Sequence, residues 1–304
     1  MDRRSFMLKS AILASSMLLP FKVLSKPTAD NNLNGATFKE VEPKDFIKVS
    51  YGPDKNNYFE LRLPKQIAGK KAPIAIVIHG GYWRNKYTLD YMSYFCEWLK
   101  NNGIISINME YRRIGDVGGG YPNTFLDVSA CIDSIPQVLD NIESFDIKNI
   151  DLNNTVLIGH SAGGHLATWA FSRGSITQES PLYDEKMFTI KKAISLAGLL
   201  DLEYAKKYHL SNDAVLELIN GVPLEFISKN ISPIDMLPIK NGEVILFHGN
   251  KDSEVPIEIS TNYKEKAQEN CQYFTINGAG HFDLVDPKSP YFKEVGNKIL
   301  TSFL

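Results

Sequence analysis

The chain has 304 residues, 43% of them hydrophobic and 22% charged, which is the composition of a globular protein with a sizeable core. Its formal net charge is -2, and basic and acidic residues are mixed along the whole length. Because no basic stripe could follow a phosphate backbone, the sequence argues against nucleic acid as a partner and favours a small-molecule substrate.

The N-terminal segment has the pattern of an export signal. Arg3 and Arg4 precede an apolar run over residues 11–19. The paired arginines resemble a twin-arginine signal, which carries folded proteins across the bacterial inner membrane. The run is too short to span a bilayer comfortably. We therefore predict an export signal at 1–29 and a periplasmic catalytic domain at 30–304, with no stable membrane span after processing.

Beyond this signal, short apolar runs alternate with longer amphipathic ones. We expect strands at Tyr58–Leu63, Ile74–His79, Ile104–Asn108, Thr155–Ile158, Ala193–Ala197, Val244–His248 and Gln272–Ile276. We expect helices near Leu89–Lys100, Phe125–Leu139, Ala162–Ser172, Ile257–Glu269 and Tyr291–Leu304. This alternation predicts an α/β fold, with a mostly parallel sheet covered by helices on both faces. A mixed helical stretch at about 199–240 is expected to form a small cap over the site.

The three cysteines, Cys96, Cys131 and Cys271, have no metal-ligand spacing. The apolar neighbours of Cys96 and Cys131 favour buried, inert thiols, although one disulfide stays open in an oxidising compartment. The sequence also has no His-x-x-x-His pattern, no P-loop and no dinucleotide-binding glycine pattern. We therefore predict neither a metal nor a cofactor.

The segment Gly159-His160-Ser161-Ala162-Gly163 follows a predicted strand and precedes an Ala-rich helix. Gly-x-Ser-x-Gly in this context is typical of a nucleophile elbow, a sharp turn that projects the serine oxygen above the sheet. The two glycines remove side chains that would collide in the turn. We predict Ser161 as the nucleophile and the Ala162 amide as a donor to the developing oxyanion. The alternative is a serine helix cap without chemistry.

A second glycine motif, His79-Gly80-Gly81-Tyr82-Trp83, follows an earlier strand. Gly80 and Gly81 can turn their N–H groups toward a tetrahedral intermediate because they carry no side chain, so both are candidate oxyanion-hole residues. A simple turn is the alternative. Tyr82 and Trp83 are candidate substrate-binding residues, and core packing is an equally open interpretation for both.

Two later turns supply a candidate acid and base. Asp252 follows the strand expected at 244–248, and His281 follows the strand expected at 272–276. The order Ser161, Asp252, His281 is that of the α/β-hydrolase triad, and all three positions follow carboxyl ends of strands. We predict His281 as the general base and Asp252 as the carboxylate that orients it.

Rival groups lie close to these positions. Glu254, Asp283 and Asp286 are alternative acids, but Asp283 is too near His281 in sequence to reach it easily, and Asp252 is favoured. The other histidines beside the motifs are expected to have structural, hydrogen-bonded roles, and they are His79, His160, His165 and His248.

With these residues together, the chain resembles the α/β-hydrolase superfamily, in particular its esterase, lipase and kynurenine formamidase branch. The segments 79–83 and 159–166 carry the match, and 110–113 also looks like bacterial esterases without a catalytic role. The resemblance implies cofactor-free hydrolysis of a small ester or amide. The Tyr-Trp extension of the first glycine motif is similar to arylformamidases.

Three functions remain in competition. A carboxylesterase is favoured, since a tryptophan-degrading formamidase would be expected in the cytoplasm and the chain carries an apparent export signal. An arylformamidase acting on N-formylkynurenine-type amides is the first alternative. A non-catalytic small-ligand-binding protein on the same fold is the second, and it is disfavoured because no triad residue is lost.

Overall fold

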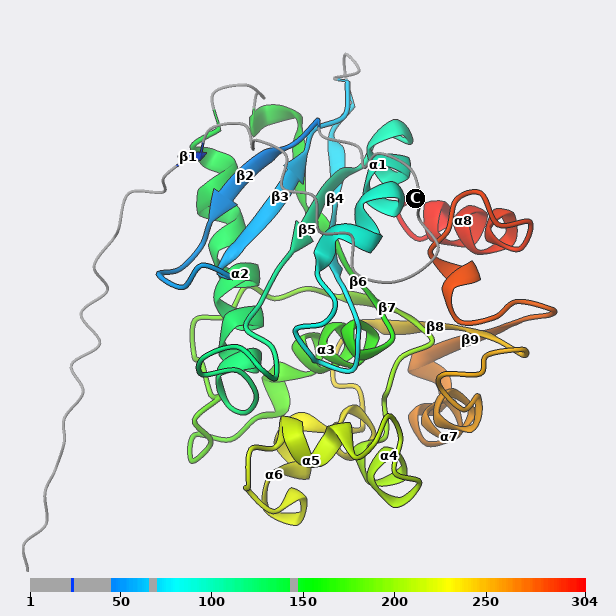
Figure 1. Ribbon diagram of the computed structural model, residues 1–304. Helices are drawn as coiled ribbons and strands as arrows, with labels where there is room; N and C mark the ends of the chain where they lie inside the picture. The colour runs from blue at the N-terminus through cyan, green and yellow to red at the C-terminus, as the bar shows by residue number, and fades with distance from the viewer. Residues whose placement is uncertain (1–22, 25–44, 66–69, 143–146) are drawn as a thin grey trace, which may run out of the picture.

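The computed structural model describes residues 23–24, 45–65, 70–142 and 147–304. One sheet runs through the molecule, and the described residues give it nine strands in the order β1-β2-β3-β5-β4-β6-β7-β8-β9 (Figure 1). The strands are β1 (Val23–Leu24), β2 (Ile47–Ser50), β3 (Tyr58–Arg62), β4 (Ala72–Ile78), β5 (Ile105–Met109), β6 (Ile150–His160), β7 (Lys192–Leu196), β8 (Glu243–Gly249) and β9 (Cys271–Ile276).

Helices connect most of the strands. They are α1 (Ser93–Asn101), α2 (Asn123–Asp140), α3 (Ala162–Phe171), α4 (Leu202–Lys207), α5 (Ala214–Leu218), α6 (Leu224–Ile231), α7 (Glu258–Ala267) and α8 (Phe292–Thr301). Short 3-10 helices complete the set, namely η1 (Leu89–Met92), η2 (Ile147–Asn149), η3 (Arg173–Ser175), η4 (Pro233–Met236), η5 (Gln268–Asn270) and η6 (Phe282–Leu284).

The predicted mostly parallel α/β sheet is confirmed. Each neighbouring pair from β5 to β9 in the sheet order is parallel, whereas β1, β2, β3 and β5 pair antiparallel at one edge. The seven strands expected from the sequence correspond to β3 through β9. The antiparallel strand β2 was not predicted, because only Val49 of its four residues is buried and its apolar run is correspondingly short.

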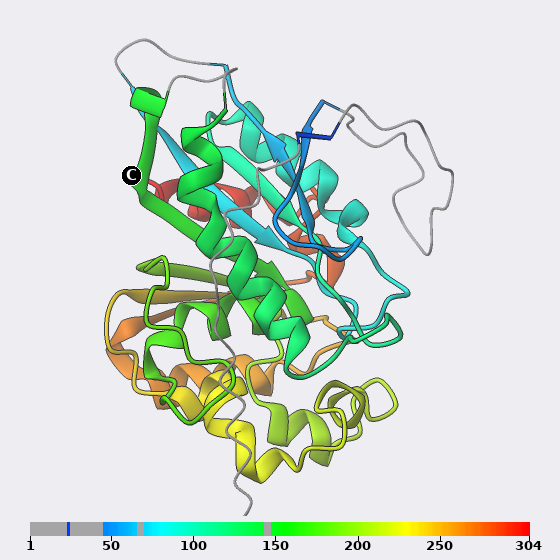
Figure 2. The ribbon, with the colours of Figure 1, turned by 90° about the vertical axis from the view of Figure 1, so that its left-hand side faces the viewer.

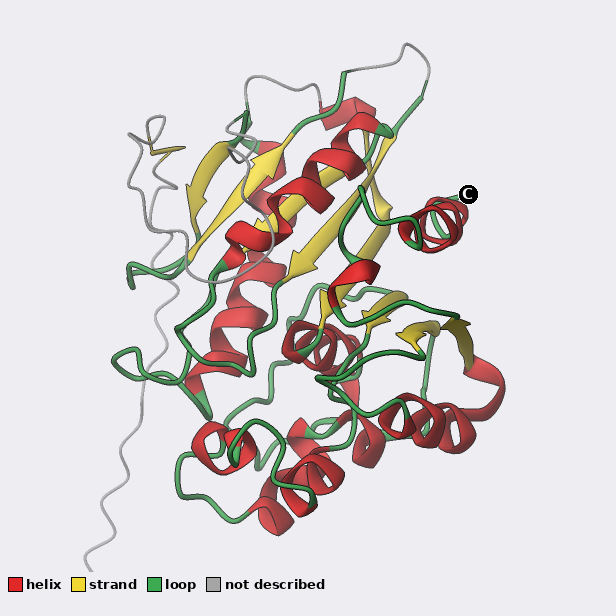
Figure 3. Cartoon of the chain, turned by 45° about the vertical axis from the view of Figure 1, so that its right-hand side comes forward, coloured by secondary structure: helices red, strands yellow, loops and turns green. Residues whose placement is uncertain are grey.

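Alternation along β4 shows how the sheet is covered on both faces. Ile74, Ile76 and Ile78 pack into one hydrophobic cluster, with residues of α2, α3 and the 199–240 segment. Ala75 and Val77 pack into the other, with residues of α1 and α8. Helices therefore lie on both sides of the strands, and α2 runs along one face (Figures 2 and 3).

The segment 199–240 lies between β7 and β8 and contains α4, α5 and α6. Its apolar residues Leu202, Leu218 and Ile231 are fully buried in the first hydrophobic cluster. In Figure 1 these helices lie below α3, on the side toward which β4 and β6 run. The segment therefore packs beside the carboxyl ends of the central strands.

The three cysteines are buried free thiols, as expected for Cys96 and Cys131 from their apolar neighbours. Across the described ranges, no helix combines the length and apolar character that crossing a bilayer requires. The expected export signal lies almost wholly outside the described residues, which include only β1 from that segment.

Candidate active site

Ser161 occupies the turn between β6 and α3. Its backbone has φ 58° and ψ -123°, an arrangement that costs an L-residue about 1–3 kcal/mol. A Cβ added to Gly163 would lie 2.0 Å from the carbonyl oxygen of Ile78, and one added to Gly159 would lie 2.0 Å from that of Gly163. The two glycines are thus sterically required. Ser161 is the N-cap of α3, but its side chain makes no capping hydrogen bond, which argues against the purely structural alternative.

His281 and Asp252 form a short hydrogen bond, 2.7 Å from Nδ1 to Oδ2. The other carboxylate oxygen accepts the backbone N–H groups of Glu254 and Val255 at 2.8 and 2.9 Å. Burial alone would raise the pKa of Asp252, but hydrogen bonds from His248 and His281 hold this pKa well below its usual range. Asp252 is therefore an ionised carboxylate that fixes the orientation of the His281 ring.

Ser161 and His281 line the same small pocket, which encloses about 40 Å³. Within the described part of the chain, no hydrogen bond joins Ser161 Oγ to His281. Such bonds are often long before substrate binds and tighten in the complex. The other pocket walls are mainly aromatic, from Tyr82, Tyr87, Tyr91 and Phe282, and Glu254 also lines the pocket.

Among the described residues, the rival carboxylates of Glu254, Asp283 and Asp286 make no hydrogen bond to His281. Asp283 accepts the N–H of Gly280 and the hydroxyl of Ser289, each at 2.7 Å. Asp286 accepts a backbone N–H of its own turn. Among the described residues, no group of three or more His, Cys, Asp and Glu is arranged to hold a metal ion.

The first glycine motif lies directly against the serine. A Cβ on Gly80 would come within 2.7 Å of Ser161 Cβ. Gly81, Tyr82 and Trp83 have φ values of 100°, 51° and 58°, so the backbone turns sharply here. In the described part of the chain, the amides of Gly81 and Ala162 donate to no protein atom, and both therefore stay available to a substrate.

We predicted that the backbone N–H of Gly80 is a donor in the oxyanion hole, and the structure differs. This N–H donates to the hydroxyl of Tyr91 at 2.5 Å and is therefore already used. Tyr91 comes from η1, where the sequence indicated only a helix. The role of Gly80 is steric, because its missing side chain lets the loop approach Ser161.

The hydroxyl of Tyr91 connects Gly80 to His160. This hydroxyl lies 3.0 Å from His160 Nδ1, and His160 Nε2 lies 3.1 Å from the carbonyl oxygen of His281. A carbonyl only accepts, so Nε2 of His160 carries the proton and Nδ1 accepts from Tyr91. Burial holds the pKa of His160 well below its usual value. We call residues 80–88 the glycine loop. His160 is thus a neutral structural histidine that links this loop to the His281 backbone.

Trp83 and Tyr82 take different roles. Trp83 is fully buried, and its indole N–H donates to His165 Nδ1 at 3.1 Å, while His165 Nε2 donates to Ile231 O at 2.7 Å. The assignment of Trp83 to substrate binding was wrong, because its side chain packs into the core. Tyr82 lines the pocket, and its hydroxyl donates to Glu254 O at 2.5 Å.

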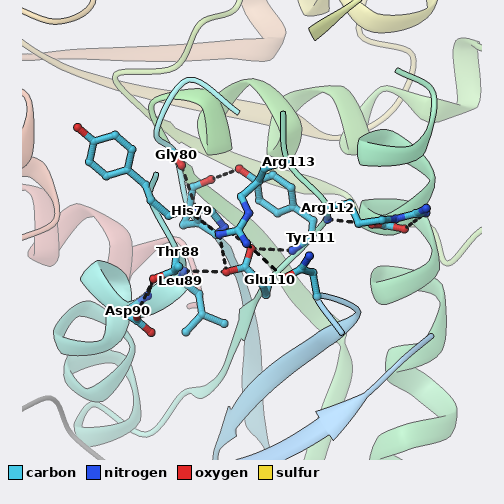
Figure 4. A network of polar contacts seen from close by, with 12 residues as sticks. His79, Gly80, Thr88, Leu89, Asp90, Glu110, Tyr111, Arg112 and Arg113 are labelled. Atoms are coloured by element: carbon cyan, nitrogen blue, oxygen red, sulfur yellow. Dashed lines mark hydrogen bonds and ion pairs between the residues drawn. The ribbon is translucent and has the colours of Figure 1, made fainter. Parts of the chain in front are cut away.

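A buried carboxylate beneath the glycine loop was given no role by the sequence. Glu110 accepts from His79 Nε2 (2.8 Å) and Tyr111 N (2.9 Å) on one oxygen, and from Arg113 Nη1 (3.0 Å) and Leu89 N (3.3 Å) on the other (Figure 4). His79 and Leu89 flank the loop, so Glu110 ties both of its ends together. The sequence signal was an acidic residue directly after the buried strand β5.

The sheet and the strained serine turn that it carries place this chain among the α/β hydrolases. The chain belongs to the BD-FAE family, whose model matches residues 59–267.

The chain is similar to several known proteins. Esterase LipC of Mycobacterium tuberculosis is 24% identical over 256 residues, which are 79% of this chain and 60% of LipC. Kynurenine formamidase of Salmo salar is 22% identical over 79% of this chain and 76% of its own length. The chain thus spans less than two thirds of LipC. Among solved structures, phosphonate-inhibited esterase B of Lactobacillus rhamnosis has a TM-score of 0.72 at 18% identity, over 87% of each chain.

Proposed function

We propose that this chain is a serine hydrolase that cleaves small carboxylic esters. Ser161 is the nucleophile, His281 the general base and Asp252 the orienting carboxylate. The observation that carries the proposal is the 2.7 Å hydrogen bond between His281 Nδ1 and Asp252, beside a pocket that His281 shares with Ser161. The name of the relative LipC, an esterase, supports the same class.

The reaction follows from the donor and acceptor roles. Asp252 holds the proton on His281 Nδ1, so Nε2 is free to take the proton of Ser161 as the serine oxygen attacks the ester carbonyl. The oxyanion that forms accepts hydrogen bonds from the backbone N–H groups of Gly81 and Ala162. The alcohol leaves with the proton from His281, and a water activated in the same way releases the acid.

Formamidase activity is the second candidate, supported by the similarity to kynurenine formamidase. N-formylkynurenine is an α-amino acid with both an ammonium and a carboxylate, so the carboxylate of Glu254 in the pocket does not decide against it. Esters stay the proposed class because the relative LipC is named an esterase.

The test compares the mature protein with Ser161→Ala on p-nitrophenyl acetate, p-nitrophenyl octanoate and N-formylkynurenine. We expect ester hydrolysis that is lost in Ser161→Ala and kept in Ser228→Ala, a control on α6. Faster turnover of N-formylkynurenine would assign a formamidase instead. A wild-type protein that is inert on all three substrates and unlabelled by a fluorophosphonate would make it a binding protein.

We also propose that residues 1–29 export the chain to the bacterial periplasm, supported by Arg3, Arg4 and the apolar run that follows. The test is fractionation of bacteria that express the full chain or its Arg3→Lys/Arg4→Lys variant. Export by this route predicts a shortened periplasmic protein that is depleted in the variant. Equal amounts in both would exclude the twin-arginine route.

We further propose that the segment 199–240 is the cap of the site. Arg84, in the glycine loop, makes several hydrogen bonds to this segment, which supports the proposal. A change in substrate affinity after these bonds are removed is its test and is developed below.

A further inference from the structure

The pocket beside Ser161 combines aromatic walls with a single carboxylate from Glu254. Tyr82, Tyr87 and Phe282 contribute aromatic residues to its lining. Aromatic rings attract cations to their faces, and a carboxylate adds a direct Coulomb attraction. A pocket of this composition therefore distinguishes substrates by charge.

The backbone of Glu254 makes two hydrogen bonds, one through its N–H and one through its carbonyl oxygen. Its N–H donates to Asp252 Oδ1 at 2.8 Å, and its carbonyl oxygen accepts from the hydroxyl of Tyr82 at 2.5 Å. In the part of the chain that the structure describes, the Glu254 carboxylate makes no ion pair and no hydrogen bond with the protein. Glu254 is exposed, and its carboxylate therefore has no partner among the described residues that would neutralise its charge.

No basic side chain among the described residues lines this pocket to balance that charge. His160, which does line it, is neutral because burial lowers its pKa. Arg84 does not line the pocket, and its guanidinium forms an ion pair with Glu217. Asp252 adds a second carboxylate directly behind His281. The charged side chain that lines the pocket without a protein partner is therefore the acidic one of Glu254.

We propose that Glu254 makes the enzyme prefer esters with a positive charge near the scissile bond, quaternary ammonium esters included, over anionic ones. The inference rests on the proposed ester hydrolysis and adds its substrate class. The cation meets the aromatic walls and the Glu254 carboxylate at once. The same charge repels the carboxylate product after the acyl group is released.

Three acetate esters of similar shape test the proposal: acetylcholine as cation, 3,3-dimethylbutyl acetate as neutral ester and 2-sulfoethyl acetate as anion. In the wild type we expect kcat/KM to fall in that order at low ionic strength. In Glu254→Gln the ratio of kcat/KM for cation over anion should fall by about tenfold. The wild-type ratio should also shrink in about 1 M salt, where the Debye length is about 3 Å.

Two variants serve as controls. Glu254→Asp keeps the charge and should retain most of the ratio, whereas Glu265→Gln, on the exposed side of α7, removes an equal charge away from the pocket and should leave it unchanged. An unchanged ratio in Glu254→Gln, or a wild-type preference for the anionic ester, overturns the inference while ester hydrolysis stands. No turnover of any ester, with no fluorophosphonate labelling, overturns the proposed function and this inference with it.

Discussion

The guanidinium of Arg84 holds the carboxylate of Glu217 on α5 through two hydrogen bonds, Nε to Oε2 at 2.8 Å and Nη2 to Oε1 at 2.9 Å. It also donates to Ser211 Oγ at 2.9 Å and to Asn212 O at 3.2 Å. Arg84 follows Trp83 directly in the glycine loop. One side chain therefore connects the loop beside Ser161 to the segment 199–240.

Removal of the Arg84 contacts should raise KM clearly and lower the free energy of unfolding only slightly. For Arg84→Met we expect KM for p-nitrophenyl esters to rise about three- to tenfold, because the loop and the cap lose their common anchor. Unfolding free energy should fall by only about 1 kcal/mol, since the pair is partly exposed. The swapped pair Arg84→Glu with Glu217→Arg should recover much of the affinity. Lys206→Met, which breaks an exposed pair within α4, is the control, and an equal rise in KM there would refute the coupling.

Gly80→Ala should abolish most activity without removing any reacting group. The added Cβ would lie 2.6 Å from His160 O and 2.7 Å from Ser161 Cβ, so the loop or the serine must move. We expect kcat/KM to fall by about a hundredfold or more, in the range of a lost oxyanion donor. Gly174→Ala, whose nearest neighbour would be Met187 Cε at 3.8 Å, should match the wild type. A Gly80→Ala enzyme within threefold of wild type would contradict the close approach.

Asp252→Asn should lower kcat by about 10⁴-fold, as expected when the tautomer of the base is no longer fixed. Its effect on stability should depend on pH. The folded pKa of Asp252 is depressed, so its contribution is complete above about pH 4 and disappears as pH falls below that value. The difference in melting temperature between wild type and variant should therefore be larger at pH 7 than at pH 3. The same difference at both values would show that Asp252 is not stabilised as an anion.

His165 should make the fold sensitive to mild acid. Burial lowers its pKa to about 4, whereas the unfolded chain takes up this proton near pH 6.5. The unfolded state binds more protons between these values, so stability falls as pH decreases, by about 3 kcal/mol down to pH 4. His165→Gln keeps a donor and an acceptor but cannot titrate. Denaturant unfolding at several pH values should show a shallower loss in the variant, and parallel curves would disprove the assignment.

The sequence predicted the central strands well, because their apolar runs are buried on both faces. Ile74–Ile78 is an example, since each residue packs into one of two clusters. The sequence predicted the strands less well at the edge of the sheet and at the strand ends. β6 begins at Ile150, earlier than expected, through polar residues such as Asn153 whose side chains are not buried. Pairing with a neighbour, rather than apolar content, makes those residues a strand.

The site was predictable where steric rules act locally. Gly159 and Gly163 lie on either side of Ser161 because backbone atoms leave no room for a side chain at these two positions. All the residues involved in this requirement fall within one five-residue motif, so the sequence alone reveals it. The partners of Gly80 and Trp83 were not predictable. Tyr91 and His165 reach them through the folded chain, and hydrogen bonds between such distant residues leave no periodic signal in the sequence.

The three buried thiols can report local opening of the folded protein. Cys96 on α1 and Cys271 on β9 have pKa values raised to about 12 by burial, and Cys131 on α2 is shifted in the same direction. Alkylating reagents attack only exposed thiolates, so each thiol becomes reactive only when its own region opens. Mass spectrometry of pulse-labelled protein would then rank the opening rates of three separate parts of the fold without any engineered residue.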